Sequence, residues 1–321
     1  MLLTVAIPNL NGAAFIETAI SSCSYLNLPS DEFEILVLDN ASTDDSIASI
    51  SRLKPSFPNL RIVENNSNIG RLPNWRKCFE EAHGKYLHYL FITDLFHEQN
   101  NLYSQVKLLE AHRDISMVLS SVLSEYSPIR HVPGKILYPF DRVINSREMI
   151  ISFAQKGILP FGALQSNLFR VADILNKGII FTERCPYRAD NIFCAEAALQ
   201  RENVFFSALP VVKWGIYKNP DRFHSRLKIE SMVEDDIRAF KIINGLLGGN
   251  TLKFENIYSA ELRSILNHAF FSRDILSAES GYLNATLKLI KRLHQEHVNI
   301  FRFLASFIKN SVTRGIEKIM D

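Results

Sequence analysis

The sequence predicts an α/β fold in which helices flank a mostly parallel sheet over residues 1–230, followed by a helical region over residues 231–321. Short apolar runs of strand length alternate with apolar residues at helical spacing in the first part of the chain. The two earliest runs stop abruptly at polar, turn-forming residues. Beyond residue 231 only helical spacing remains, which indicates a separate helical region.

Five apolar runs predict strands, at residues 4–7, 33–38, 60–63, 86–92 and 116–123. Strands separated by helices of this length form βαβ units with right-handed crossovers. Ser42-Thr43-Asp44-Asp45 predicts a helix start, with a capping hydroxyl and acids in the first turn. The prolines within residues 124–145 indicate a loop that an active site could use.

Later signals predict helices at residues 146–156, 171–177 and 191–200 and a strand at 210–217. Helical spacing then covers residues 232–247, 252–271 and 282–320. From Leu283 onward seven Lys or Arg stand against three acids, a net charge of +4. Basic amphipathic helices attract anionic membranes. Peripheral membrane contact is therefore one role expected for residues 283–321. The alternative roles are a helical cap on the sheet domain and a homo-oligomer contact.

Composition narrows the class of protein. The chain of 321 residues is 47% hydrophobic and carries a net charge of only +2, so no nucleic-acid partner is expected. The four cysteines, Cys23, Cys78, Cys185 and Cys194, have neither metal-ligand nor paired-disulfide spacing. We read them as reduced core residues of a cytoplasmic protein, which the basic end of the chain could hold at the inner face of the membrane.

Asp39 is a ligand candidate before any family is considered. It ends the run Glu34-Ile-Leu-Val-Leu-Asp39, just as Asn9 ends the N-terminal run. In parallel α/β sheets, ligands bind beyond the carboxyl ends of the strands.

Four ordered motifs then suggest a family. They are Ile7-Pro8-Asn9-Leu10-Asn11, Glu34 to Asp44, Asn68-Ile69-Gly70-Arg71 with Asn74, and Ala82-His83-Gly84-Lys85-Tyr86-Leu87 leading to Thr93-Asp94. In this order they resemble the inverting glycosyltransferases of family 2, which have the GT-A fold. The resemblance covers some 95 residues, is fainter to about Phe223, and leaves out the C-terminal helices.

The resemblance implies transfer of a sugar from a nucleotide diphosphate donor. Asp39 matches the family acid that hydrogen-bonds the base, commonly uracil, since a carboxylate accepts the ring N–H. Its alternative role is a turn carboxylate or a helix cap. Asn9 and Asn11 would line the base pocket and Arg71 would lie against base or phosphates, although turn or solvated roles fit them too. The other donor residues expected are Pro8, Asn68, Thr93 and Asp94.

The family's acidic cluster, which holds Mg²⁺ or Mn²⁺, is reduced here to Asp94. One carboxylate with diphosphate oxygens and water could still bind the cation. His224 resembles the histidine that completes such a site, and His97 is a weaker substitute. An isolated histidine is more often structural.

Inversion needs a general base that takes the proton of the acceptor hydroxyl. Pro186-Tyr187-Arg188-Ala189-Asp190 resembles the family pattern and assigns this role to Asp190. Capping of the following helix is the alternative, and Glu183 and Glu196 are fallback bases. Gln165 and Ser166 would contact the acceptor.

These implications predict an inverting glycosyltransferase that uses a UDP-sugar donor and a glycan or lipid-linked acceptor in surface polysaccharide synthesis. One rival is a catalytically silent GT-A relative that binds nucleotide-sugar or a partner, because the acidic cluster is eroded. The other rival is a nucleotidyltransferase. The glycine-rich phosphate loop that is usual in that class is absent between Ile7 and Phe15 of this sequence.

Overall fold

The computed structural model describes residues 1–124, 140–155, 161, 164–215, 229–249 and 291. Its chain divides into two compact units. The first comprises Met1–Ser146, Phe161–Thr182 and Phe193–Pro220, and the second comprises Arg147–Pro160, Glu183–Ile192 and Asp221–Asp321. Each unit is described on its own. Three segments from the predicted first domain, 147–160, 183–192 and 221–230, thus cluster with the C-terminal part of the chain, and the boundary at residue 230 stays a prediction.

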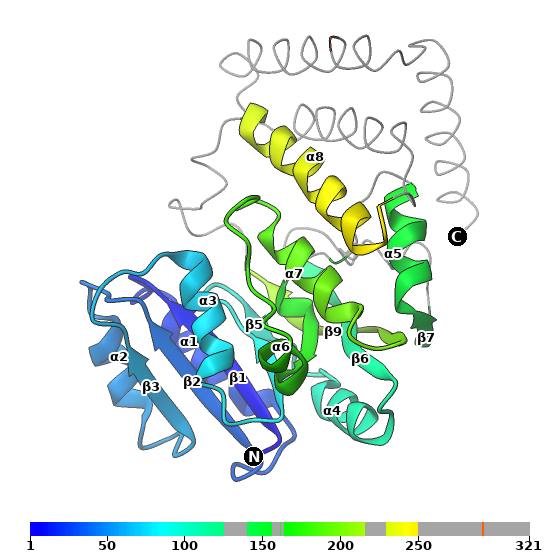
Figure 1. The fold of residues 1–321 in the computed structure, drawn as a ribbon. Helices are drawn as coiled ribbons and strands as arrows, with labels where there is room; N and C mark the ends of the chain where they lie inside the picture. The colour runs from blue at the N-terminus through cyan, green and yellow to red at the C-terminus, as the bar shows by residue number, and fades with distance from the viewer. Residues whose placement is uncertain (125–139, 156–160, 162–163, 216–228, 250–290, 292–321) are drawn as a thin grey trace. The chain divides into compact units, whose positions relative to one another are not determined.

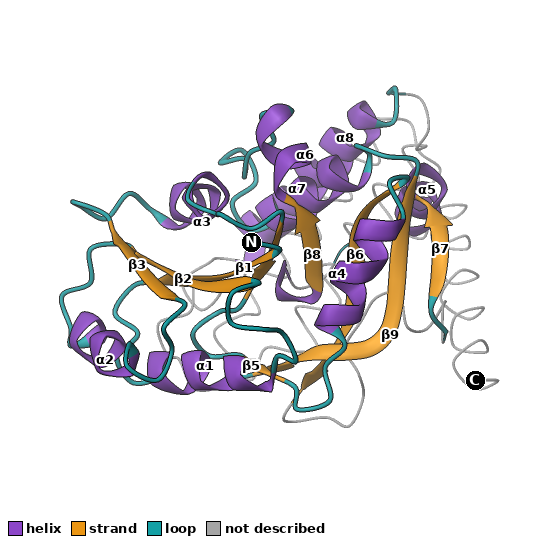
Figure 2. Ribbon diagram, turned by 90° about the horizontal axis from the view of Figure 1, so that it is seen from below, coloured by secondary structure: helices purple, strands orange, loops and turns teal. Residues whose placement is uncertain are grey.

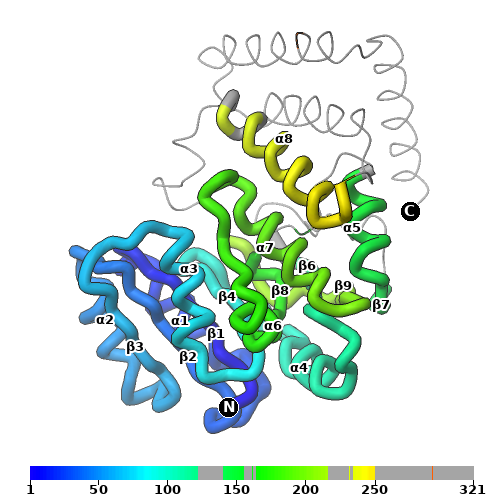
Figure 3. Tube along the Cα trace, viewed as in Figure 1, coloured from blue at the N-terminus to red at the C-terminus, as the bar shows by residue number. Residues whose placement is uncertain are grey.

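All strands of the described residues belong to one sheet in the first unit (Figures 1 and 3). They are β1 (Leu3–Asn9), β2 (Phe33–Asp39), β3 (Leu60–Glu64), β4 (Tyr86–Tyr89), β5 (Leu95–Phe96), β6 (Ile115–Ser124), β7 (Arg142–Asn145), β8 (Asn167–Arg170) and β9 (Asn203–Trp214). Their order is β3-β2-β1-β4-β8-β6-β9-β5, with β7 paired to β9.

The helices are α1 (Ile16–Ser22), α2 (Ser46–Leu53), α3 (Arg71–Glu80), α4 (Leu102–Ala111), α5 (Ser146–Gln155), α6 (Val171–Asn176), α7 (Ala189–Ala198) and α8 (Ile229–Leu246), with the 3-10 turns η1 (Cys23–Tyr25) and η2 (Leu164–Ser166). The predicted helices at residues 252–271 and 282–320 lie outside the described residues, as does the end of the strand predicted at 210–217.

The fold class predicted from the sequence is confirmed, with one refinement of the sheet. β3, β2, β1 and β4 run parallel, as the βαβ pattern predicts. The other half is mixed, because β8 is antiparallel to β4 and β6, while β5 and β7 are antiparallel to β9. "Mostly parallel" therefore describes only the N-terminal half.

Helices cover both faces of this half-sheet. α1 and α2 lie on one face and α3 on the other (Figure 2). Alternation along the strands sends Val5 and Ile7 to the α1 side, where they pack with Ile16 and Ile20. On the α3 side, Phe79 makes edge-to-face contacts with Tyr89 and Phe169, with ring centroids 5.8 Å apart in both pairs. Strands buried on both faces explain the unbroken apolar runs in the sequence.

The predicted helix start at residues 42–45 is wrong. The helix α2 begins at Ser46, and its first turn carries no acid. The hydroxyl of Ser42 bonds to Asp39 instead of capping the helix. A hydroxyl followed by acids is an ambiguous signal, because the same residues favour turns and helix caps.

Pro8 lies in a central strand because of where the neighbouring strand stops. Pairing of β1 with β4 ends at Ala6 opposite Tyr89, and the Leu90 amide donates to the Ala6 carbonyl at 2.9 Å. The backbone nitrogen of Pro8 is directed toward the β4 side, as the backbone polar groups of Ala6 are, because Pro8 lies two residues further along the same strand. Its missing N–H therefore points past the end of β4 and breaks no ladder hydrogen bond.

His88 is a buried titratable group on β4. Its Nδ1 donates to the Asn167 carbonyl at 3.1 Å, its ring stacks on Phe96 at 5.4 Å, and Nε2 is buried without a hydrogen-bond partner among the described residues. Burial lowers the pKa of His88 to about 4, because the charged form would lose its hydration.

This burial predicts an acid-dependent loss of stability. The unfolded chain binds a proton at His88 below a pKa of about 6.5, whereas the folded chain does not. Stability should therefore be fully present above pH 7, fall as the pH drops, and lose roughly 3 kcal/mol by pH 4. Urea unfolding of the wild type and of His88→Phe from pH 7 to 4 measures this difference, with exposed His112→Gln as the control. A His88→Phe profile parallel to that of the wild type would contradict it.

Candidate functional site

The carboxyl ends of β1 and β2 form the polar centre of the site. Asn9 and Asp39 are directly paired in the parallel register, and the Asn40 amide continues the ladder by donating to the Asn9 carbonyl at 2.9 Å. Both side chains are buried, with 1% of each exposed. The apolar runs of both strands thus bring their first polar residues to the same level of the sheet.

The carboxylate of Asp39 is held by three donors. Oδ1 accepts Asn9 Nδ2 at 2.7 Å and the Ser42 hydroxyl at 2.6 Å, while Oδ2 accepts the Ser42 amide at 2.8 Å. A carboxylate oxygen can accept two hydrogen bonds, so Oδ2 has capacity for one more donor beyond those of the described residues. Asp39 thus has the turn role that the sequence left open, and this capacity leaves the base-binding role compatible with it.

The turn after β2 has an unusual backbone. Ala41 adopts φ +61°, in the left-handed region, at a cost of about 1 kcal/mol for a non-glycine residue. Asn11 is likewise left-handed, at φ +51°, and its side chain accepts the Thr43 amide at 2.8 Å. The Ser42 hydroxyl also accepts the amide of Asn11 at 2.9 Å. These contacts tie the loop after β1 to the loop after β2, which is how strained backbone persists.

A set of amide side chains joins Asp39's turn to the start of α3. The side-chain oxygen Oδ1 of Asn40 accepts hydrogen bonds from Asn65 Nδ2 at 3.1 Å and from the Ile69 amide at 3.0 Å. Its Nδ2 donates to Asn68 Oδ1 at 2.8 Å. Asn65 in turn donates to Asn74 at 2.8 Å. The predicted donor residue Asn68 therefore belongs to this network. The structure adds Asn40, Ser42 and Asn65 to the hydrogen-bonded polar residues around Asp39 and Asn68, and the sequence reading did not name them as candidate site residues.

Arg71 opens α3 directly after this network. Gly70 precedes it at φ +89°, a conformation that side chains rarely adopt. The guanidinium of Arg71 stacks on Trp75, with Cζ 4.6 Å from the ring centroid. Trp75 also contacts Phe91, with centroids 5.2 Å apart. Phe91 lies in the segment that leads to Asp94, so one aromatic contact links α3 with the loop after β4.

Asp94 lies in a turn between β4 and β5 and is 1% exposed. Its Oδ1 accepts the Gly215 amide at 3.1 Å. A Cβ at residue 215 would lie 1.7 Å from the Thr93 carbonyl oxygen, so only glycine fits there. The predicted donor residue Thr93 thus packs against a backbone 122 positions further along the chain. Neither sequence spacing nor periodicity indicates this contact.

The loop after β4 also meets the loop after β1. A Cβ at Gly12 would lie 2.2 Å from Asn9 Oδ1 and 2.9 Å from Ile92 Cδ1. The donor residues predicted from β1, β2, the start of α3 and the loop after β4 therefore lie along one edge of the sheet.

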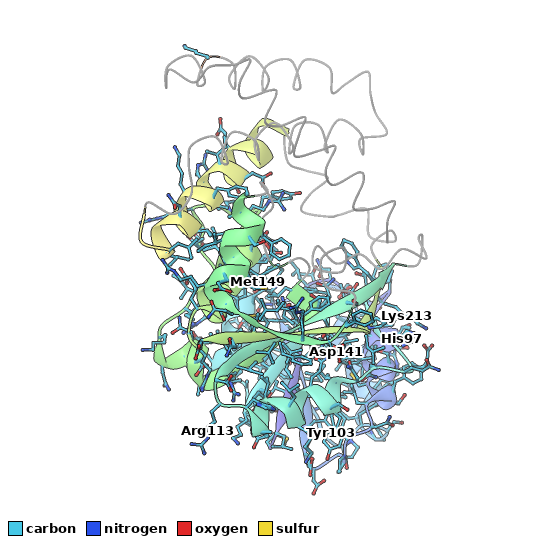
Figure 4. All side chains as sticks on the ribbon, turned by 90° about the vertical axis from the view of Figure 1, so that its right-hand side faces the viewer. His97, Tyr103, Arg113, Asp141, Met149 and Lys213 are labelled. Atoms are coloured by element: carbon cyan, nitrogen blue, oxygen red, sulfur yellow. The ribbon has the colours of Figure 1, made fainter. Side chains whose placement is uncertain are left out.

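The cation expected at this edge would be bound by few protein ligands. Within the described residues, no three His, Cys, Asp or Glu side chains gather in one place. His224 lies outside those residues. His97 Nδ1 accepts the Gln99 amide at 3.1 Å within its own turn, and His97 lies beside Lys213 (Figure 4). Mg²⁺ is commonly bound by one or two carboxylates plus substrate phosphates, so Asp94 alone fits such a site.

The remaining predicted residues lie elsewhere. Gln165 and Ser166 are buried in η2, 4% and 7% exposed, so their acceptor role stays a prediction. Asp190 is the second residue of α7, and its Oδ1 accepts the Asn191 amide at 2.9 Å, consistent with a capping role. Of the fallback bases, Glu183 is exposed. Burial raises the pKa of Glu196.

The cysteines and the helices bear on two further predictions. All four cysteines are buried and form no disulfide. Among the described residues no helix has both the length and the apolar character to cross a bilayer.

A parallel half-sheet whose strand ends carry buried, hydrogen-bonded polar residues defines an α/β protein with a ligand site at that edge. The family model of glycosyl transferase family 2 matches residues 4–170, just over half of the chain. The chain therefore belongs to glycosyltransferase family 2, as its motifs suggested.

Individual relatives agree with the family. An uncharacterized glycosyltransferase of Mycoplasma genitalium is 34% identical over 100 residues, which cover 30% of this chain and 33% of that protein. The poly(ribitol-phosphate) β-N-acetylglucosaminyltransferase TarS of Staphylococcus aureus is 20% identical over 208 residues, 64% of this chain and 34% of TarS. The matches thus span about a third of the length of these relatives.

Solved structures show the same GT-A fold. A TarS fragment in complex with UDP-GlcNAc superposes with a TM-score of 0.64 at 18% identity, over 91% of this chain and 81% of the fragment. A mannosyltransferase of Pyrobaculum calidifontis, in complex with GDP-Man and Mn²⁺, gives 0.54 at 15% identity, over 99% and 86% of the two chains.

The amide network makes a prediction about stability. Asn40→Ala removes a buried amide and leaves the Ile69 N–H without its acceptor, so we expect a loss of about 2 kcal/mol in the free energy of unfolding. Urea unfolding measures it. Asn59→Ala is the control, since Asn59 makes one bond of 3.1 Å to the Phe33 carbonyl at the other end of β2. Equal losses in the two variants would contradict a special role for Asn40.

Proposed function

We propose that the chain transfers a sugar, with inversion at the anomeric carbon, from a UDP-sugar to a hydroxyl of a glycan or lipid-linked acceptor in surface polysaccharide synthesis. The observation that carries the proposal is the buried Asp39 carboxylate at the end of β2, fixed by Asn9 and Ser42. An acceptor-only group in this place suits the imide N–H of uracil.

The donor assignment has local and comparative support. Asn9 and Asn11 line the same loops as Asp39, and Arg71 begins the helix beside them, where a cation suits a diphosphate. The name of TarS describes an N-acetylglucosaminyltransferase, and its crystals contain UDP-GlcNAc or UDP. The mannosyltransferase neighbour instead holds GDP-Man, so the choice of uridine rests on Asp39.

The transfer step is a single displacement. The carboxylate of Asp190 takes the proton of the acceptor hydroxyl while that oxygen bonds to the anomeric carbon. The bond between this carbon and the diphosphate oxygen breaks on the opposite face, and the nucleoside diphosphate leaves with its electron pair. A divalent cation held by Asp94, with His224 as a second ligand, would neutralise the diphosphate when bound.

The base assignment predicts a separation of binding from chemistry. Asp190→Asn should lower the transfer rate by about 10²–10⁴-fold, because a general base contributes that much. Its affinity for UDP, measured by calorimetry, should stay within about twofold, because a base acts on the acceptor. Glu183→Gln and Glu196→Gln are the matched controls and should keep the wild-type rate. Wild-type turnover in Asp190→Asn would refute the assignment.

The cation assignment predicts metal-dependent nucleotide binding. Titration of UDP with Mn²⁺ should show higher affinity than with EDTA, since a cation held by Asp94 would neutralise the phosphates. Asp94→Asn keeps an oxygen for the Gly215 amide but loses the charge, so the gain from Mn²⁺ should largely disappear. Equal affinities with and without Mn²⁺ in the wild type would reject the cation assignment.

A further inference from the structure

The segment that carries Asp190 is anchored to α8 within the second unit. Residues 183–192 and α8 both belong to this unit, and both lie beyond the residues that the family model matches. Cys185 and Ile192 form a small buried cluster with Ala239 of α8. This apolar contact fixes the two ends of the segment against the helix.

Two adjacent carboxylates of α8 hold the middle of the segment. Asp235 Oδ2 accepts the Tyr187 amide at 2.9 Å, and Asp236 forms a salt bridge with Arg188 Nε. Asp235 and Asp236 are only 5% and 4% exposed. Asp235 Oδ1 also accepts Arg238, which donates to the Arg184 carbonyl at 3.2 Å. The residues of the segment that make these contacts all lie within six positions of Asp190 in the sequence.

The charges of this contact are coupled to Asp190. Burial opposes the charged form of Arg188, yet its pKa is raised, because Asp236 attracts and hydrogen-bonds the guanidinium while Tyr187 and Asp190 add smaller attractions. The guanidinium also stacks on the Tyr187 ring, with Cζ 4.4 Å from the centroid. The Arg188 guanidinium is thus neutralised chiefly by Asp236 of α8, with a smaller attraction from Asp190 two residues further along the chain.

Stability alone is a poor explanation of such a pair. A buried ion pair often stabilises a protein no more than apolar side chains of the same volume would, because both charges lose their hydration. What it supplies is a fixed geometry, since Asp236 neutralises the guanidinium and holds it in one place.

We propose that Asp235 and Asp236 are positioning residues for Asp190. They fix the Tyr187–Arg188 backbone and the Arg188 charge, so that the base is held in a productive orientation and a helix outside the family match contributes to the active site. The inference rests on the proposed function, in which Asp190 is the base.

The test compares Asp236→Asn and Asp236→Glu with Asp173→Asn in the full chain. Asp173 is the matched control because it forms a comparable, partly buried salt bridge with Arg201 at 2.6 Å in the first unit. Transfer rates with UDP-sugar donors give kcat and the donor KM, calorimetry with UDP gives the fraction of competent protein, and thermal unfolding gives Tm.

We expect Asp236→Asn to lower kcat about 10- to 100-fold with the donor KM within about twofold, since a displaced base slows only the chemical step. Asp236→Glu should recover much of the rate. Asp173→Asn should keep the wild-type kcat at a similar loss of Tm. If Asp236→Asn does not fold, Arg188→Lys replaces it, since it keeps the charge but loses the guanidinium fork and stacking.

The pH profile separates positioning from a general loss of structure. Asp236→Asn removes the main counter-charge of Arg188 and one negative charge near Asp190, so the acidic limb of kcat/KM should move to lower pH. In Arg188→Gln, which removes a positive charge, it should move to higher pH. The other charged or titratable groups of this contact are Glu183, Arg184, Cys185, Tyr187, Glu234, Asp235 and Arg238.

The outcomes keep the two proposals apart. Wild-type kcat and an unmoved limb in Asp236→Asn, with Asp190→Asn inactive, would overturn the positioning role and leave the proposed function intact. Equal losses in Asp236→Asn and Asp173→Asn would also overturn it. Full turnover in Asp190→Asn would overturn the base assignment and this inference together.

Discussion

The polar edge of the sheet, at the carboxyl ends of β1 and β2, depends on the in-register pairing of these two strands, which places Asn9 opposite Asp39. A slip of one residue would turn every side chain of a strand to the other face and separate the two polar groups. The register is enforced by the apolar residues of both strands, which are buried on both faces. A buried carboxylate is tolerated there because three donors satisfy it, and those same donors fix the direction in which it can accept a ligand.

Hydrogen bonds of amide side chains connect the Asn9–Asp39 pair to the rest of this edge. Asn40 couples the turn after β2 to the start of α3, and the stacking of Arg71 on Trp75 continues this to the loop before Asp94. Gly215 closes the other side, where its backbone packs on Thr93. The edge is thus assembled from segments far apart in sequence. They are held by hydrogen bonds between amide side chains, by hydrogen bonds to the Asp39 and Asp94 carboxylates, and by close packing.

The sequence predicted the βαβ order and the strand-end position of Asp39, because buried parallel strands leave long apolar runs that stop where a site begins. It misassigned Ser42, whose hydroxyl has the same sequence signature as a helix cap. β5, β7 and β8 were missed, since strands of two or four residues carry too little pattern. Asp235 and Asp236 were missed because acids on an amphipathic helix are usually a solvated face, and only the fold shows that they meet Tyr187 and Arg188.

We infer that Asp39 reads the base of the donor through one hydrogen bond to a ring N–H. Calorimetric titration of the protein with UDP, N3-methyl-UDP and CDP tests this most directly, because these nucleotides share the ribose and diphosphate, and among the three only UDP carries an N–H at ring position 3. We expect UDP to bind at least about tenfold more tightly than the other two, since a site built to accept a ring N–H rejects ligands that lack it. Equal affinities for all three nucleotides would contradict it.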